Sequence, residues 1–154
     1  MSFFDQLGAL FAKYDVLGAF WVNIQLTFWA AIGSFVLGAI LALMRISPVP
    51  SLRWAGTIYV HLFRNTPLTI LMTLALLGVW TQFQLSFSTD FETNFFVYAV
   101  IVLSIYHASF VCEAIRSGVN TVPTGQAEAA RAIGLGFMDT ERMILFTQAL
   151  GGSI

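Results

Sequence analysis

The sequence predicts an all-α integral membrane protein, a bundle of three spanning helices followed by a polar helical segment. Hydrophobic residues make up 58% of the 154 residues, and charged residues only 10%, against about 25% in a typical soluble domain. The mean hydropathy of +0.81 points the same way. The charged residues are also unevenly distributed, because three long stretches contain none. Together these observations exclude an ordinary soluble fold.

The three stretches without Asp, Glu, Lys or Arg are residues 16–44, 65–89 and 93–112. A helix rises about 1.5 Å per residue, so each stretch is long enough to cross a hydrocarbon core of about 30 Å. We expect all three spans to belong to a single transmembrane domain over residues 1–154. The predicted spans are residues 16–44, 66–83 and 94–113.

The first span is rich in small residues, which let helices approach closely in lipid. These are Gly18, Gly33, Gly38, Ala30, Ala31, Ala39 and Ala42. Asn23, Gln25 and Thr27 add polar groups two or three turns into the span. We expect them to bond to a neighbouring helix, with substrate contact as the alternative. The span ends at residues 47–50, because prolines there cannot continue a helix.

The segment before the second span mixes apolar residues with charge, so residues 52–64 are expected as a helix on or just inside the membrane surface. Asn65 or Thr66 then suits the N-cap of the second span, and Pro67 suits its first turn. We interpret Pro67 as a helix start in preference to a gating hinge. Arg64 is interpreted as an interfacial arginine in preference to a residue of a translocation path.

The third span carries Ser104, Tyr106, His107 and Ser109 among its apolar residues. We expect His107 to be a packed, hydrogen-bonded residue rather than a proton relay. After it, Glu113 and Arg116 are three residues apart on one helix, and this spacing predicts an ion pair at the interface.

The charges of the connecting segments predict the orientation of the spans. The loop 45–53 carries two arginines and no acid, whereas the loop with Asp90 and Glu92 carries only acids. The positive-inside rule then places 45–53 in the cytoplasm and both the N-terminus and 84–93 outside. Everything after about Glu113 returns to the cytoplasm.

A polar segment, residues 125–134, follows the third span, and it has few large apolar residues for so hydrophobic a chain. Glu128 falls in the first turn of a predicted helix, where the helix dipole favours a carboxylate. Gly134 and Gly136 end that helix, and Asp139 suits the cap of a second one reaching about Leu150. The pattern predicts a helix–glycine–helix elbow over about 121–150, which we interpret as a docking surface.

The spacing in this elbow resembles a known motif. Glu128-Ala129-Ala130, three residues, Gly134, nine residues and then Ile144 resembles the EAA loop in membrane subunits of bacterial ABC importers. The second part of the resemblance is to the polar amino-acid permeases, and most of all to actinobacterial glutamate permeases. The likeness to polar amino-acid permeases rests on Arg64-Asn65-Thr66-Pro67 and on Tyr106, Glu113, Arg116, Gly118, Gly125 and Gln126. The likeness to actinobacterial glutamate permeases rests on residues 64–69, 116–122 and 130–137. The resemblance covers nearly the whole chain.

This resemblance implies the N-terminal part of the ABC importer type I permease fold, in the plasma membrane of a bacterium. It implies import of a polar amino acid, with glutamate or aspartate favoured. The implied partners are cytoplasmic P-loop ATPase subunits, a second permease subunit (identical or homologous) and an extracytoplasmic amino-acid-binding protein. The residues implied in coupling to the ATPase are Gly125, Gln126, Glu128, Ala129, Ala130, Gly134 and Ile144. Residues expected along a translocation path or in gating are Arg64, Asn65, Thr66, Pro67, Gln25, Tyr106 and Glu113.

Two departures from the family pattern are visible. Thr147 stands where the family usually has proline, which alters the end of the second coupling helix. The family also continues with further spanning helices, so we expect the chain to be truncated at its C-terminus.

Other function classes find little support in the sequence. No Gly-x-x-x-x-Gly-Lys-[Ser/Thr] phosphate loop occurs, so ATP is expected on a partner subunit and no cofactor on this one. No metal-ligand cluster or nucleophile–base pair is evident, and a net charge of −1 gives no nucleic-acid footprint. Two alternatives stay open, a membrane enzyme centred on Tyr106, His107 and Glu113, and a non-transporting scaffold or channel subunit.

Overall fold

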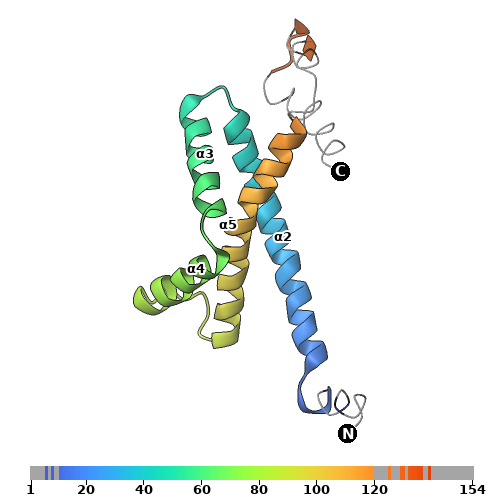
Figure 1. Cartoon of the computed structure of the whole chain (residues 1–154), viewed down its shortest axis with the longest axis vertical. Helices are drawn as coiled ribbons and strands as arrows, with labels where there is room; N and C mark the ends of the chain where they lie inside the picture. Colours follow the sequence, from blue (N-terminus) through green and yellow to red (C-terminus); the bar gives the residue numbers. More distant parts are fainter. Residues whose placement is uncertain are drawn as a thin grey trace.

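The computed structural model describes residues 11–119 together with positions 6, 8, 125, 129, 130, 132–136 and 139. All regular secondary structure in this part of the chain is helical, so the all-α prediction is confirmed (Figure 1). The helices are α2 (Val16–Ile46), α3 (Pro50–Arg64), α4 (Leu68–Thr73), the π-helix η1 (Leu74–Gln82) and α5 (Phe91–Val119).

The helices α2 and α5 lie side by side and run in the same direction, while α3 runs in the opposite direction (Figure 1). The chain follows α2, reverses at 47–49 and returns along α3. It then bends by 97° into α4 and η1, and a loop leads to the start of α5. Consequently α2 and α5 both begin at one end of the bundle and finish at the other.

Two described helices, α2 and α5, are each long and apolar enough to cross a membrane. They contain the predicted first and third spans, and both extend a few residues further. The predicted second span, 66–83, corresponds to α4 and η1. These helices reach sufficient length and hydropathy only together with α3, as a pair bent by 97°, so the second span stays a prediction.

The helix α3 packs on the rest of the bundle through one face while most of its residues are exposed, and its depth in the membrane stays a prediction. Gly56 and Val60 are buried, and the Tyr59 hydroxyl donates a hydrogen bond of 2.7 Å to the Ile105 carbonyl on α5. The apolar face of an amphipathic helix packs equally well on lipid or on other helices. Here it packs on α2 and α5.

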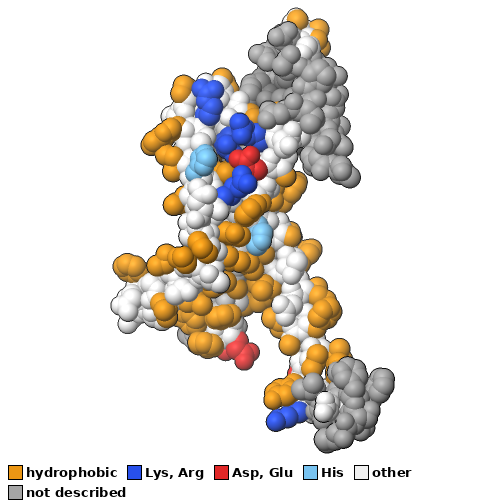
Figure 2. All heavy atoms as spheres, in the orientation of Figure 1, with side chains coloured by type: hydrophobic (Ala, Val, Ile, Leu, Met, Phe, Trp, Pro, Cys, Tyr) orange, Lys and Arg blue, Asp and Glu red, His pale blue; other side chains and the backbone are white. Residues whose placement is uncertain are grey.

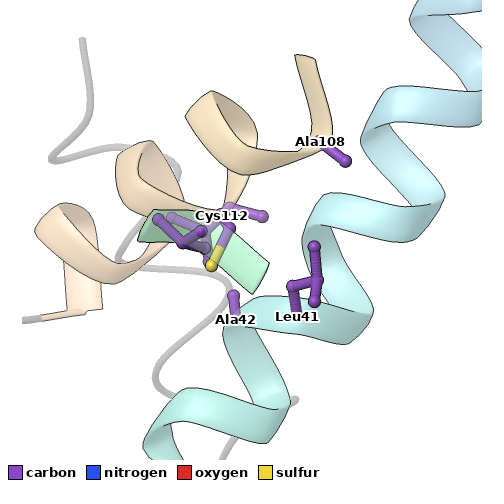
Figure 3. Packing of buried hydrophobic residues seen from close by; sticks show 6 residues of the cluster. Leu41, Ala42, Ala108 and Cys112 are labelled. Atoms are coloured by element: carbon purple, nitrogen blue, oxygen red, sulfur yellow. The ribbon is translucent and has the colours of Figure 1, made fainter. Parts of the chain in front are cut away.

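The core lies where α2, α3 and α5 meet (Figure 3). Its buried residues are Leu41, Ala42, Val60, Ala108, Cys112 and Ile115. Small residues bring α2 and α5 close together, as predicted. A Cβ atom on Gly38 would lie 2.6 Å from the Val111 Cβ, and one on Gly33 would collide with the Ser104 hydroxyl. Gly18 is different, since it faces only Asp15, the residue that caps its own helix.

The polar residues of the first span bond within their own helix, which corrects the expected bonds to a neighbour. The Asn23 amide donates to the Ala19 carbonyl at 3.0 Å, and the Thr27 hydroxyl donates to the Asn23 carbonyl at 2.8 Å. A donor four residues after a carbonyl can reach it without any second helix. Gln25 is exposed.

Candidate functional site: a helix break and an arginine cluster

The break between α3 and α4 is built from backbone bonds rather than from a side-chain cap. Asn65 ends α3, and its N–H donates to the His61 carbonyl at 3.2 Å. The Thr66 hydroxyl points back to the Leu62 carbonyl at 2.8 Å. Neither residue caps the next helix, so that expectation is wrong. Pro67 occupies the N-cap position instead.

Pro67 starts the next helix through its carbonyl, which accepts bonds from the N–H groups of Ile70 at 3.0 Å and Leu71 at 3.3 Å. Its φ of −60° lies within the range that the pyrrolidine ring allows, and its ψ of 138° is extended. The interpretation of Pro67 as a helix start is therefore confirmed. The 97° bend follows from this extended residue between two helices.

Next to the break, three arginines from three helices surround one carboxylate, as Figure 2 shows in blue around red. Arg45 at the end of α2 donates to Glu113 Oε1. Arg64 at the end of α3 has its Nη1 3.7 Å from the same oxygen. Arg116 Nη1 lies 3.8 Å from Oε2, which confirms the predicted ion pair. We call these four residues the arginine cluster.

The members of the arginine cluster differ in burial. The Arg45 side chain is only 7% exposed, whereas those of Arg64 and Arg116 are 46% and 42% exposed. A buried guanidinium needs a paired anion, and the carboxylate of Glu113 supplies it. The Arg64 guanidinium also lies 5.6 Å from the centroid of the Phe110 ring, within the range of a cation–π contact.

Sequence reasoning identified Glu113, Arg116 and Arg64 but did not bring them together with Arg45. The Glu113–Arg116 pair can be predicted from sequence because the two residues are three positions apart on one helix. Arg45 and Glu113 are 68 residues apart, so only the packing of α2 against α5 reveals the contact. An arginine that ends one span and a glutamate near the end of another were the available signal.

The polar residues of α5 do not assemble into a catalytic group with Glu113. His107 is exposed, and its Nδ1 lies 2.9 Å from the Leu103 carbonyl, so it is hydrogen-bonded as expected. Its ring lies against Tyr106 and Phe110. Tyr106 is half-buried, with its ring against His107 and Phe110. Within the described residues no group of three or more His, Cys, Asp or Glu side chains forms a metal site.

The described part of the coupling segment ends a helix at Gly134. The glycine has a φ of +86°, a conformation that favours glycine, and the Leu135 N–H donates to the Ala130 carbonyl at 3.1 Å. This bond, from the second residue after the cap back to the last helical turn, is typical of a Schellman motif. Ala130 is buried, whereas Gly125 and Ala129 are exposed. Gln126, Glu128 and Ile144 lie outside the described residues.

An apolar groove of about 470 Å³ lies between η1 and α5, in the half of the bundle where α5 begins. Its walls are almost entirely aliphatic and aromatic, and the Tyr98 hydroxyl donates to the Leu85 carbonyl at its edge at 2.6 Å. The lining residues are Phe63, Leu71, Leu74, Ala75, Val79, Leu85, Ser86, Phe87, Tyr98, Ile101, Val102 and Ile105.

Residues 34–154 match the model of a family described as "Binding-protein-dependent transport system inner membrane component". The chain belongs to this family. The family match agrees with the membrane-importer resemblance seen in the sequence, and the relatives described next confirm the resemblance to amino-acid permeases.

The chain is 47% identical over 145 residues to the glutamate transport system permease protein GluC of Corynebacterium efficiens, covering 91% of this chain and 64% of that protein. It is 33% identical over 155 residues to the glutamate/aspartate import permease protein GltJ of Escherichia coli, covering 92% and 61%. The chain thus spans less than two thirds of the length of these relatives.

One solved structure, titled "Crystal structure of an amino acid ABC transporter with histidines", has the same arrangement of helices. The TM-score is 0.66 at 29% identity, over 83% of this chain and 56% of that chain. This likeness supports the permease fold expected from the sequence.

Proposed function

We propose that this chain works in a permease subunit of an ATP-driven importer for polar amino acids, with glutamate or aspartate as the favoured substrate. The observation that carries the proposal is the family match over residues 34–154. Relatives named for glutamate and for glutamate/aspartate support the substrate class. In this role the chain is not an enzyme and binds no cofactor, since ATP is bound and hydrolysed by a partner.

The partners proposed are cytoplasmic P-loop ATPase subunits, a second permease subunit and an extracytoplasmic binding protein. Coupling to the ATPase falls to the elbow that follows α5. The helix end at Gly134 supports this assignment, because a glycine in left-handed conformation turns the chain sharply while Ala129 and Ile133 face outward. The residues proposed for coupling are Gly125, Gln126, Glu128, Ala129, Ala130, Gly134 and Ile144.

The proposed orientation puts the arginine cluster at the cytoplasmic face and the N-terminus outside. The charges support it, because Arg45 and Arg53 lie at the turn between α2 and α3 whereas Asp90 and Glu92 lie at the start of α5, and positive charge favours the cytoplasmic side. Of the residues proposed along the pathway, Arg64, Tyr106 and Glu113 lie close to one another around Phe110 and α5, and Asn65, Thr66 and Pro67 form the adjacent break. Gln25 lies apart from them on exposed α2.

The test is uptake of labelled glutamate by vesicles that contain this subunit together with its ATPase and binding protein. Uptake should require ATP and should be competed by aspartate more strongly than by arginine. Glu128→Lys should abolish uptake and loosen the ATPase on purification, whereas Glu92→Lys, the same charge change in the first turn of α5, should leave the ATPase bound. Full transport by the Glu128→Lys subunit would refute the coupling assignment, and failure to recover any ATPase would refute the function.

A further inference from the structure

We propose that Arg64 and Arg116 bind the phosphate group of an anionic phospholipid, whose acyl chain lies in a second groove between α2 and α5. This lipid site does not rest on the transport function proposed above, although Arg64 is also among the residues proposed along the pathway.

The first support is the charge of the arginine cluster, in which three guanidinium groups share one carboxylate. Among the described residues, Arg45 makes the one contact to Glu113 of hydrogen-bond length. The N···O distances of 3.7 Å for Arg64 and 3.8 Å for Arg116 exceed the range of about 2.7–3.2 Å for a hydrogen bond. Both outer guanidinium groups therefore keep donors for another anion.

Phosphate is the anion that this arrangement suits. A guanidinium has five N–H donors in a planar fork, and the fork matches the oxygens of a phosphate. Arg64 and Arg116 lie toward the two different oxygens of Glu113, and nearly half of each side chain is exposed. One phosphate near both side chains would offset the excess positive charge left after the pairing of Arg45 with Glu113.

The second support is the position of the arginine cluster relative to the membrane. Glu92 and Glu113 are both on α5, 21 residues apart. At about 1.5 Å per residue they are separated by roughly 32 Å along the helix, close to the thickness of the hydrocarbon core of about 30 Å. With Glu92 at one interface, the arginine cluster lies at the level of the lipid headgroups on the other side. Basic pockets between helices at that level bind anionic headgroups.

The third support is a groove of about 440 Å³ between α2 and α5, which we call the α2–α5 groove. It is mainly apolar and is lined by Ala30, Ala31, Leu103, His107, Phe110 and Val111, with Thr27 and Ser34 at its wall. Phe110 belongs to this groove and also lies under the Arg64 guanidinium. From there the groove runs toward Leu103, which is two turns deeper along α5. An acyl chain attached to a phosphate at Arg64 would follow this direction.

The experiment measures lipid binding to the intact subunit in detergent by native mass spectrometry, with phosphatidylglycerol and phosphatidylcholine of identical acyl chains. The wild-type protein should prefer phosphatidylglycerol. Arg64→Gln and Arg116→Gln should each weaken that preference roughly fivefold, as expected for one arginine near an anionic lipid. Arg53→Gln removes an exposed arginine of α3 outside the cluster and is the matched control, which should keep the wild-type preference.

Two further arms separate a lipid from a free anion. Ala31→Trp, at an exposed position of the α2–α5 groove, should weaken binding of both lipids without changing the preference between them. Inorganic phosphate should compete only weakly, because it has no acyl chain. Three results would each overturn the proposal. They are full displacement of the lipid by inorganic phosphate, an unchanged lipid preference in the protein with both Arg64→Gln and Arg116→Gln, and an equal loss of lipid preference in Arg53→Gln. Transport is not measured, so the failure of the proposed function would not affect this result.

Discussion

The two halves of the bundle are held together by different means. Where α2 and α5 end, Ala42, Ala108 and Cys112 are completely buried among α2, α3 and α5. Where α5 begins, η1 has no buried residue and a groove of about 470 Å³ lies between it and α5. Large side chains such as Leu74 and Leu77 are exposed on η1.

This difference shows which part of the bundle is complete within the described chain. The packed half satisfies both its small-residue contacts and its buried charge with residues from its own three helices. The open half relies on aromatic stacking, such as the Trp80 ring 5.8 Å from Tyr98, and on a loop tied to α5. Substitutions of one type should therefore have unequal effects in the two halves.

The largest effect is expected in the packed half for Glu113→Gln. The change leaves Arg45, whose side chain is 7% exposed, without its anion. Removal of one partner of a fully buried ion pair costs about 3–5 kcal/mol, and because the Glu113 side chain is 28% exposed the loss in free energy of unfolding should be about 3 kcal/mol, the lower end of that range. Denaturation in mixed detergent would measure it, with Glu92→Gln in the exposed first turn of α5 as the control. Equal stability of the two variants would contradict the structural role of the arginine cluster.

A pair of glycine substitutions compares the halves directly. Gly38→Ala places a Cβ 2.6 Å from the Val111 Cβ, and such overpacking costs about 1–3 kcal/mol. Gly78→Ala in η1 meets nothing within 4 Å, so it should leave stability unchanged or raise it by under about 1 kcal/mol. The same denaturation assay compares them. A larger loss for Gly78→Ala than for Gly38→Ala would show that the two halves have been assigned the wrong way round.

The loop of the open half depends on Asn94, a buried residue of α5. Its Oδ1 accepts hydrogen bonds from the N–H groups of Phe87 at 2.7 Å and Ser88 at 3.3 Å. Asn94→Leu leaves these donors without that acceptor, at a cost of about 1–3 kcal/mol. Amide hydrogen exchange at Phe87 and Ser88 should accelerate.

The control for this variant is Asn23→Leu, at an exposed position of α2, which should leave exchange in the loop unchanged. Unchanged protection of both loop amides in Asn94→Leu would mean that the groove holds this loop without the asparagine.

The smallest effect concerns Asp90, in the same loop. Hydrogen bonds to Asp90 from Thr93, including its N–H at 2.8 Å, lower the pKa of the Asp90 carboxyl from its usual 3.8. A lowered pKa stabilises the folded state above pH 3.8, and this contribution disappears as the pH falls through the lower folded value. Exchange of the Thr93 amide should therefore rise only in strong acid, and Asp90→Asn should remove this pH dependence. A carboxyl signal that titrates above pH 3.8 would contradict the lowered pKa.

The features predicted well from sequence are those that follow from short spacings. The charge-free stretches predict α2 and α5, and the spacing of three residues predicts the contact of Arg116 with Glu113. The glycine at 134 predicts the helix end there. Contacts between distant segments were beyond sequence reasoning. The contacts of α3 with α2 and α5 could not be predicted, because an amphipathic helix has the same pattern on a membrane surface and within a bundle. The N-cap at Pro67 was missed because the Thr66 hydroxyl bonds to the preceding turn instead.

The break at Asn65–Pro67 has a consequence for how deep in the membrane the chain can turn. In hydrocarbon no water satisfies a free backbone group, so irregular segments there are costly. Here the Asn65 N–H and the Leu62 and Pro67 carbonyls have partners within the chain, and proline has no N–H to satisfy. The turn therefore leaves fewer backbone groups for solvent to satisfy than an open loop of equal length would.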